Sequence, residues 1–362
     1  MTLATVPASL NLIAKETPLI DVRAPVEFIQ GGLPGAVNLP LMVDDERHHV
    51  GIAYKQQGQQ AAIGLGERLV SGKTKQARVA AWQAYVVSHP EAIIYCFRGG
   101  LRSQIAQQWL AESGISRPRI DGGWKALRQR LCQRIDEASN QPMLVVAGLT
   151  GCAKTMLINQ LSNGIDLEAF ANHKGSAFGR QPEEPTTQIN FEHALAKRLI
   201  GLSGKLVIED ESRQIGNANI PLPFWQAMQR APRIRIEMPL DWRLEQLRRD
   251  YIEALERNYI ARYGQQEGWR RMQRQLANAL ERLAKRLGNA RLQRLQRLQA
   301  MAFGAHARGN IQAHEAWLAP LLTEYYDPLY RYHLEKNRDS RPMQLHVGDW
   351  ESCLEAAKQW ST

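Results

Sequence analysis

The chain contains no long apolar segment and few cysteines. No apolar run approaches the roughly 18–20 residues that a membrane helix needs, and the chain does not open with a basic stretch followed by an apolar one. The four cysteines, Cys96, Cys132, Cys152 and Cys353, show no C-x-x-C spacing. The absence of that spacing argues against a disulfide framework or a zinc knuckle and fits a reducing compartment. We therefore expect a soluble, unexported, cytoplasmic protein that does not contact a membrane.

Acidic residues are also in deficit, and the deficit is local. The net charge is +10, and residues 241–310 alone hold 15 Lys and Arg against 7 Asp and Glu. Almost all of these cations are arginines, with Tyr251, Tyr259, Tyr263 and Trp269 among them. Arginine pairs with phosphate and stacks on bases, so this segment is a candidate nucleic-acid surface. The alternative is a solvated helical arm whose charges only keep it soluble.

The first part of the chain has the pattern of a small α/β domain. Residues 18–22, 35–40 and 92–97 are short apolar runs typical of buried strands, and residues 103–114 are predicted to form a helix. Strands that alternate with helices favour a parallel sheet. We expect this domain to cover residues 1–136.

A polar hinge at 136–142 is followed by a second α/β pattern. We expect a P-loop domain over residues 137–240, with a buried strand at 143–148 and another at 205–212 that ends in acids. Leucines then recur at helical spacing, which predicts a basic helical segment over 241–310 with a hairpin broken at 288–290. Their stripe is expected to form a core. Residues 311–362 are expected to pack on the P-loop domain.

The stretch "YCFRGGLRSQ" (95–104) places one thiol in a turn suited to an anion. Cys96 lies where a predicted strand gives way to a helix, and Arg98 and Arg102 add positive charge. Inward backbone N–H groups and a helix N-terminus favour a thiolate in such a turn. Two classes of enzyme use a loop in which an arginine follows the cysteine after five residues, as Arg102 follows Cys96. They are the cysteine phosphatases and the rhodanese-type sulfurtransferases. The stretch "LIDVRAPVEFIQGGLPGAVNLP" (19–40) resembles the N-terminal rhodanese signature and favours the second.

The stretch "GLTGCAKT" (148–155) follows a predicted strand and precedes a predicted helix, as a P-loop does. It departs from the usual pattern at Ala153, where a second glycine is expected. We expect the loop to bind phosphate through Gly148, Thr150, Gly151, Lys154 and Thr155. Thr155 would contact Mg²⁺, with Asp210, or alternatively Glu209, as the acid near that metal. The loop "NHKGSAFGR" (172–180) would lie over the phosphates and contribute Arg180.

Further motifs extend the resemblance along nearly the whole chain. They are "NLPLMVDDER" (38–47), "YKQQG" (54–58), "RGGLRS" (98–103), "DGGWKALR" (121–128), "EDESRQIG" (209–216) and "TEYYDPLYRYHLEK" (323–336). With the fused rhodanese-like and P-loop patterns, they resemble the tRNA 2-selenouridine synthase family. That family replaces the sulfur of wobble 2-thiouridine by selenium from selenophosphate. It also transfers a geranyl group from geranyl diphosphate to that sulfur, and the S-geranyl nucleoside is an intermediate.

The resemblance implies roles for these residues. Cys96, Arg98 and Arg102 would handle selenophosphate, and the P-loop would hold the diphosphate of the geranyl donor with Mg²⁺. The tRNA would be bound by arginines of the basic segment: Arg248, Arg249, Arg262, Arg270, Arg271 and Arg274. An enzyme that supplies selenophosphate is a candidate partner. The alternative is an RNA-stimulated P-loop kinase or ATPase with a rhodanese regulatory domain.

Overall fold

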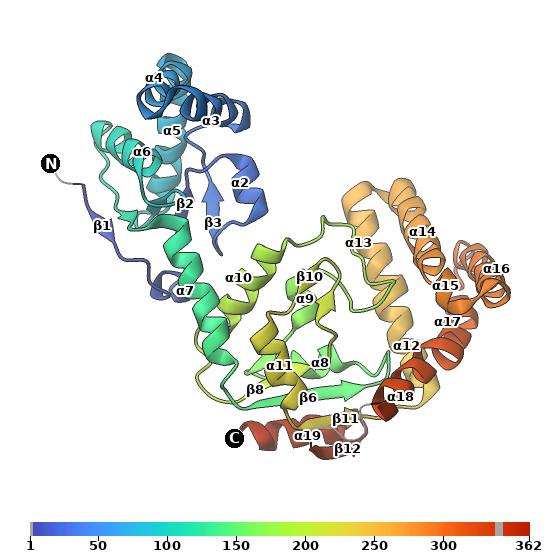
Figure 1. The fold of residues 1–362 in the computed structure, drawn as a ribbon. Coiled ribbons are helices and arrows are strands. Elements are labelled where there is room, and N and C mark those ends of the chain that lie inside the picture. Colours follow the sequence, from blue (N-terminus) through green and yellow to red (C-terminus); the bar gives the residue numbers. More distant parts are fainter. Residues whose placement is uncertain (1–2, 337–342) are drawn as a thin grey trace. The chain divides into compact units, whose positions relative to one another are not determined.

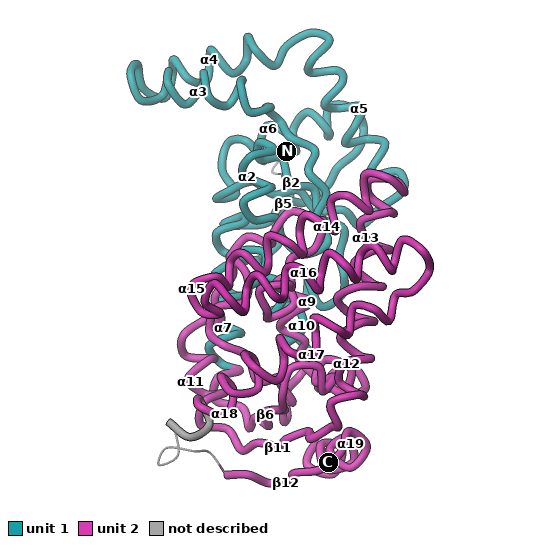
Figure 2. Tube along the Cα trace, turned by 90° about the vertical axis from the view of Figure 1, so that its right-hand side faces the viewer, with its two compact units in different colours: residues 1–137, 189–201 teal, residues 138–188, 202–362 magenta. Residues whose placement is uncertain are grey.

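The computed structural model describes residues 3–336 and 343–362, and the chain packs as two compact units (Figure 1, Figure 2). Unit 1 comprises residues 1–137 and 189–201, and unit 2 comprises residues 138–188 and 202–362. Residues 189–201 thus pack within unit 1, although we expected them inside a P-loop domain spanning 137–240. Each unit has its own parallel sheet, which confirms the α/β fold class.

The sheet of unit 1 has five parallel strands in the order β1-β5-β4-β2-β3. The strands are β1 (Thr5–Val6), β2 (Leu19–Asp21), β3 (Ala36–Asn38), β4 (Ile93–Tyr95) and β5 (Arg119–Ile120). The three predicted strands are therefore present as β2, β3 and β4. Asp21 pairs in register with Tyr95, so the carboxyl ends of β2 and β4 lie side by side. Loops that follow these two strands meet at one edge of the sheet.

Helices account for most of the remaining chain of unit 1. They are α1 (Asn11–Ala14), α2 (Pro25–Gln30), α3 (Asp44–Gln57), α4 (Gln59–Leu69), α5 (Gly72–Ser88), α6 (Leu101–Glu112), α7 (Gly123–Ala138) and α10 (Gln188–Leu199). The predicted helix at 103–114 is confirmed as α6. Helices α3, α4 and α5 were not predicted. Helix α3 buries only Ala53, so its sequence shows little apolar periodicity.

Unit 2 has a five-stranded parallel sheet in the order β12-β11-β6-β8-β7 and a small antiparallel pair. The strands are β6 (Met143–Gly148), β7 (Gly164–Ile165), β8 (Leu206–Glu209), β9 (Gln214–Ile215), β10 (Ala218–Asn219), β11 (Arg233–Ile236) and β12 (Gln344–Gly348). Val146 pairs with Glu209. The acidic end of β8 therefore lies directly beside the end of β6, where the P-loop begins.

The helices of unit 2 fall into two groups. Those near the sheet are α8 (Lys154–Ile158), α9 (Leu167–Ala171), α11 (Leu222–Arg230) and α19 (Trp350–Ser361). The others follow one another along the chain: α12 (Leu240–Arg248), the π-helix η1 (Arg249–Glu253), α13 (Ala254–Tyr263), α14 (Gln265–Arg282), α15 (Ala284–Leu287), α16 (Asn289–His306), the 3₁₀-helix η2 (Ile311–His314), α17 (Glu315–Leu321), the π-helix η3 (Leu322–Tyr326) and α18 (Asp327–Lys336). Among the described helices, none combines the length and apolar character needed to cross a membrane.

The leucine stripe is core, as predicted. Leu276, Leu280 and Leu295 are fully buried in one cluster. The helical run is interrupted at Gly288, whose φ of +76° suits a residue without a side chain, as the expected break at 288–290 requires.

The helical core continues beyond residue 310, where we expected packing on the P-loop domain to begin. Trp317 and Tyr325 still belong to the helical core. Strand β12 instead pairs with β11, and Cys353 and Leu354 of α19 pack against the core of the sheet. Of residues 311–362, the first part therefore packs in the helical core and residues from β12 onward pack on the sheet, while 337–342 lie outside the described residues.

Candidate functional site

Cys96 follows β4 directly and lies buried at the base of a tight loop. Its Sγ is 3.2 Å from the Ser103 hydroxyl and 3.8 Å from the carbonyl oxygen of Gly100. The Ser103 hydroxyl also donates to Gly100 O at 2.9 Å. The thiol is therefore held by the loop and by the first turn of α6, whose N-terminus is a favourable place for negative charge.

Glycines let two loops interlock around this thiol. Gly99 and Gly123 have φ values of +65° and +58°, in the left-handed region. A Cβ on Gly123 would lie 2.4 Å from Cys96 O and 2.4 Å from Gly99 N. Trp124 N donates to Cys96 O at 2.8 Å, so the turn in "DGGWKALR" supports the thiol loop from behind. That motif thus acquires a positioning role that its sequence alone did not indicate.

The two arginines of the loop have different surroundings. Arg102 forms a two-pronged pair with Glu27, with Nη1–Oε2 at 2.6 Å and Nη2–Oε1 at 3.3 Å, and Arg47 reaches the same carboxylate at 3.1 Å. Burial favours the neutral acid, but Arg102 and Arg47 lower the pKa of Glu27 below its usual value. Arg98 is exposed, and its guanidinium lies 5.7 Å from the Phe97 ring centroid. An anion in the loop would meet Arg98 more readily than Arg102.

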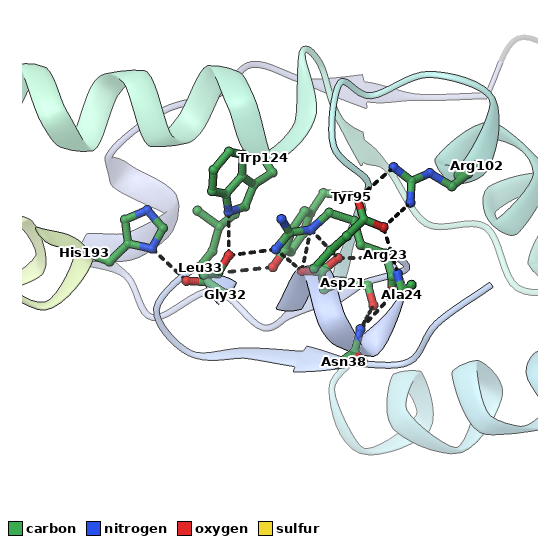
Figure 3. Close-up of polar contacts among 12 residues, drawn as sticks. Asp21, Arg23, Ala24, Gly32, Leu33, Asn38, Tyr95, Arg102, Trp124 and His193 are labelled. Atoms are coloured by element: carbon green, nitrogen blue, oxygen red, sulfur yellow. Dashed lines mark hydrogen bonds and ion pairs between the residues drawn. The ribbon is translucent and has the colours of Figure 1, made fainter. Parts of the chain in front are cut away.

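A buried polar network centres on Asp21 and Arg23 at the end of β2 (Figure 3). Arg23 pairs with Asp21, with Nη2–Oδ2 at 2.7 Å, and its guanidinium lies 4.9 Å from the Trp124 ring centroid. Burial alone would lower the pKa of Arg23, but the Asp21 carboxylate outweighs it and raises that pKa. His193 of α10 contacts Gly32 O through Nδ1 at 2.7 Å, and burial lowers its pKa to about 4. At neutral pH, Arg23 is therefore charged and His193 is neutral.

The P-loop of unit 2 is tightly packed at its glycines. A Cβ on Gly148 would lie 2.7 Å from Ile236 O, and one on Gly151 would lie 2.8 Å from Arg243 O. Ala153 adopts φ +58° and ψ 43°, the left-handed conformation. A side chain there is strained. Alanine in place of the expected glycine at position 153 therefore carries a conformational cost.

A buried ion pair anchors this loop. Arg243 donates from Nε to Thr150 O at 2.9 Å, and its two terminal nitrogens bind Asp327 at 2.9 and 2.6 Å. Both side chains are nearly inaccessible to solvent. Neither residue was predicted. Asp327 lies in the motif "TEYYDPLYRYHLEK", which was the only sequence signal for it.

The acid that contacts Thr155 is Glu209, and Asp210 has another partner. The Thr155 hydroxyl is 3.0 Å from Glu209 Oε2 and 3.3 Å from Glu168 Oε2. Asp210 instead pairs with Arg233 at 3.1 Å. Glu209 is the last residue of β8 and Asp210 follows it, and adjacent side chains of an extended chain point to opposite sides, so Glu209 reaches the loop and Asp210 does not.

Carboxylates crowd around Lys154. Burial, with Glu168 and Glu211, raises the pKa of Glu209 well above its usual value, and burial and Glu168 raise that of Glu211 to about 8. Burial alone would lower the pKa of Lys154, but Cys152 and the three acids raise it. In the described part of the chain, no three acidic, His or Cys side chains form a ready metal cage. The all-oxygen donors fit Mg²⁺, which commonly takes one or two carboxylates and substrate phosphates.

The loop at 172–180 lies over these acids, but Arg180 points elsewhere. Gly175 N donates to Glu168 Oε1, and the Ser176 hydroxyl is 3.1 Å from Tyr251 OH. Arg180 lines a cavity of about 300 Å³ formed with α13 and α14, where Tyr263 and Arg271 also contribute. The structure thus associates Arg180 with the basic helices and not with the P-loop.

Five of the six predicted RNA-binding arginines are exposed, all but Arg248, and three of the six pair with nearby acids. Arg248 is largely buried and pairs with Glu253 and Glu315, and Arg249 pairs with Glu245. Four of the exposed arginines lie on α13 and α14: Arg262, Arg270, Arg271 and Arg274. Arg271 pairs with Glu267, one turn away on α14, at 2.7 Å. Arg271 and Arg262 lie 4.3 and 5.5 Å from the centroid of the Tyr263 ring. We call these four arginines with Tyr263 the arginine–tyrosine cluster.

Unit 1 also contains a cavity of about 770 Å³ that was not predicted. It lies among α3, α4 and α6, and Glu27 and Arg102 are at its wall beside the thiol loop. Its apolar lining is formed by Leu41, Met42, Val50, Ile52, Ala62, Ile63, Val70, Leu101, Ile105 and Trp109.

Two family models match the chain. The one described as "tRNA 2-selenouridine synthase AAA domain" matches residues 141–362, and the one described as "Rhodanese-like domain" matches residues 7–130. Curated relatives that carry the name tRNA 2-selenouridine synthase match nearly the whole chain. The protein from Chromohalobacter salexigens is 65% identical, covering 96% of this chain and 95% of its own length. Those from Serratia proteamaculans and Bordetella bronchiseptica are each 48% identical, covering 90% and 95% of this chain and 89% and 95% of their own lengths.

Proposed function

Because this chain belongs to the tRNA 2-selenouridine synthase family, we propose that it replaces the sulfur of wobble 2-thiouridine in tRNA by selenium, in two steps. The first step attaches a geranyl group to the sulfur, and the second displaces the geranylated sulfur. One observation carries the proposal: a single chain, similar over nearly its whole length to relatives of that name, contains both a buried thiol loop and a P-loop.

The P-loop is suited to the first step. The sulfur attacks carbon 1 of geranyl diphosphate, the carbon–oxygen bond breaks, diphosphate leaves and the base loses its N3 proton. Lys154 lies at the start of α8, where it and the backbone N–H groups can stabilise the charge that develops on the diphosphate. Thr155 and Glu209 would hold Mg²⁺, which would neutralise further phosphate charge. We propose Glu209 for this role because Asp210 is paired with Arg233.

The thiol loop is suited to the second step. Alkylation turns the sulfur into a better leaving group, because it departs as a thiolate and not as sulfide. Water attack at the phosphorus of selenophosphate breaks the P–Se bond and yields phosphate and HSe⁻. We propose that this step takes place in the thiol loop, where the Cys96 thiol would give its proton to the departing selenium and regain one from the attacking water. Arg98 would receive the phosphate, since Arg102 is paired with Glu27.

The arginine–tyrosine cluster is suited to tRNA. Four exposed guanidinium groups can neutralise backbone phosphates, and Tyr263 offers a face on which an unstacked base or an arginine can stack. Arg180 lines the adjoining cavity with Tyr259 and Arg274. We therefore assign Arg180 to RNA binding. Arg248 is excluded from this role because it is largely buried against two acidic partners.

A reconstitution tests both steps. Anticodon stem-loop RNA with 2-thiouridine is incubated with geranyl diphosphate, selenophosphate and Mg²⁺, and its nucleosides are identified by mass spectrometry. We expect Cys96→Ser to geranylate but not selenate. Lys154→Ala should lose geranylation yet selenate RNA that is already geranylated. The opposite pattern would reverse the assignment of the loops. RNA-stimulated ATP turnover with neither product would instead favour the kinase or ATPase alternative.

A further inference from the structure

The cavity of unit 1 is apolar, sizeable and next to the thiol loop. Its volume of about 770 Å³ lies within the range of roughly 300–1,000 Å³ that is typical of small-molecule sites. Ile52 and Leu101 contribute to its wall yet remain 39% and 45% exposed. Large apolar side chains that stay accessible inside a concave wall are available to a further apolar group.

The charges at the wall disfavour a free diphosphate. Arg102 and Arg47 share the carboxylate of Glu27, and Lys55 and Glu67 add one charge of each sign. The wall thus offers little net positive charge. A neutral hydrocarbon chain fits it better than a phosphorylated donor does.

The position of the cavity relates it to selenium delivery. Leu101 and Arg102 are wall residues, and the next residue, Ser103, contacts Cys96 Sγ at 3.2 Å. A nucleoside whose carbon 2 faces Cys96 would carry its sulfur substituent toward the same end of α6.

We propose that this cavity binds the geranyl chain of S-geranyl-2-thiouridine during selenium transfer. The cavity still holds that chain when geranyl thiolate leaves the base. The inference rests on the proposed two-step function. HSe⁻ adds to carbon 2 and a C–Se bond forms. The C–S bond then breaks, geranyl thiolate takes the negative charge away, and the hydrogen of HSe⁻ ends on N3. Bound in the cavity, the chain orients carbon 2, and the departing thiolate moves away from the base.

Binding without selenophosphate provides a test that does not depend on turnover. Anticodon stem-loop RNA with S-geranyl-2-thiouridine is compared with the same RNA carrying S-methyl-2-thiouridine, by calorimetry. Nine additional carbons on an apolar wall predict that the geranyl RNA binds about 100-fold more tightly, even with the chain partly buried. Ile52→Asn should reduce the affinity for the geranyl RNA about tenfold and leave that for the methyl RNA unchanged. Val87→Asn is the matched control, because Val87 is an exposed apolar residue of unit 1 outside the cavity.

A second variant fills the cavity. Ala62 and Ala61 are neighbours on α4, but only Ala62 lines the cavity. Ala62→Phe should slow single-turnover selenation of geranyl RNA, whereas Ala61→Phe should not. Equal affinity of the unmodified protein for both RNAs, or an unaltered preference in Ile52→Asn, would overturn the cavity assignment. If the protein prefers geranyl RNA through Ile52 but never converts it, the cavity stands and the proposed function fails.

Discussion

The buried pair of Arg243 and Asp327 gives the sharpest prediction. Asp327→Asn keeps the shape of the side chain but leaves the guanidinium of Arg243 without its counter-charge, although both side chains are at most 10% exposed. Removing one partner of a buried ion pair costs about 3–5 kcal/mol. We therefore expect the free energy of unfolding of unit 2 to fall by about 3 kcal/mol or more, measured by urea denaturation.

Two further variants separate stability from function. Glu245→Gln breaks the exposed pair with Arg249, where both side chains are about half accessible, and should cost less than about 1 kcal/mol. Arg243→Met combined with Asp327→Leu removes both buried charges and should recover most of the lost stability. That double variant should still bind geranyl diphosphate more weakly, because Thr150 O loses the Arg243 Nε–H. A loss below about 1 kcal/mol for Asp327→Asn would refute the reasoning.

Three other perturbations follow from the structure. Ala153→Gly should stabilise unit 2 by up to about 1 kcal/mol and tighten geranyl diphosphate binding by calorimetry, because it relieves a left-handed alanine. His193→Asn should flatten the dependence of unit 1 stability on pH. Burial lowers the pKa of His193 to about 4 in the folded protein, so the stability gained from its neutral ring is full above about pH 6.5 and is lost as the pH falls toward 4. Arg271→Ala with Arg274→Ala should weaken tRNA binding and reduce the salt slope by about 1–2.

Each of these has an outcome that contradicts it. An Ala153→Gly protein that unfolds more easily and binds the donor less well would show that the strain is absent. His48→Asn changes an exposed histidine, and an equal effect on the pH profile there would exclude a specific role of His193. Arg68→Ala removes an exposed arginine of unit 1, and a matching loss of salt dependence would mean that the arginine–tyrosine cluster is not the tRNA surface.

Local features were predictable because local chemistry produces them. The apolar runs at 18–22 and 143–148 form β2 and β6, and the glycine break at 288 ends a helix where expected. Cys96 and the P-loop were recognisable because a glycine-rich turn between a strand and a helix has few other uses. Residues 44–88 were not assigned, since a helix such as α3 that buries one residue carries almost no periodic signal.

The sequence by itself determined the two α/β units, the thiol loop, the P-loop and the family. Only the tertiary structure decided the partners of their charged residues. Arg102 faces Glu27, Thr155 faces Glu209, and Arg243 faces Asp327, which is 84 positions away in the chain. The physical reason is that an ion pair depends on which strands and helices become neighbours, and spacing along the chain does not specify that. The apolar cavity has the same origin, because its wall is assembled from α2, α3, α4, α6 and the segments next to them.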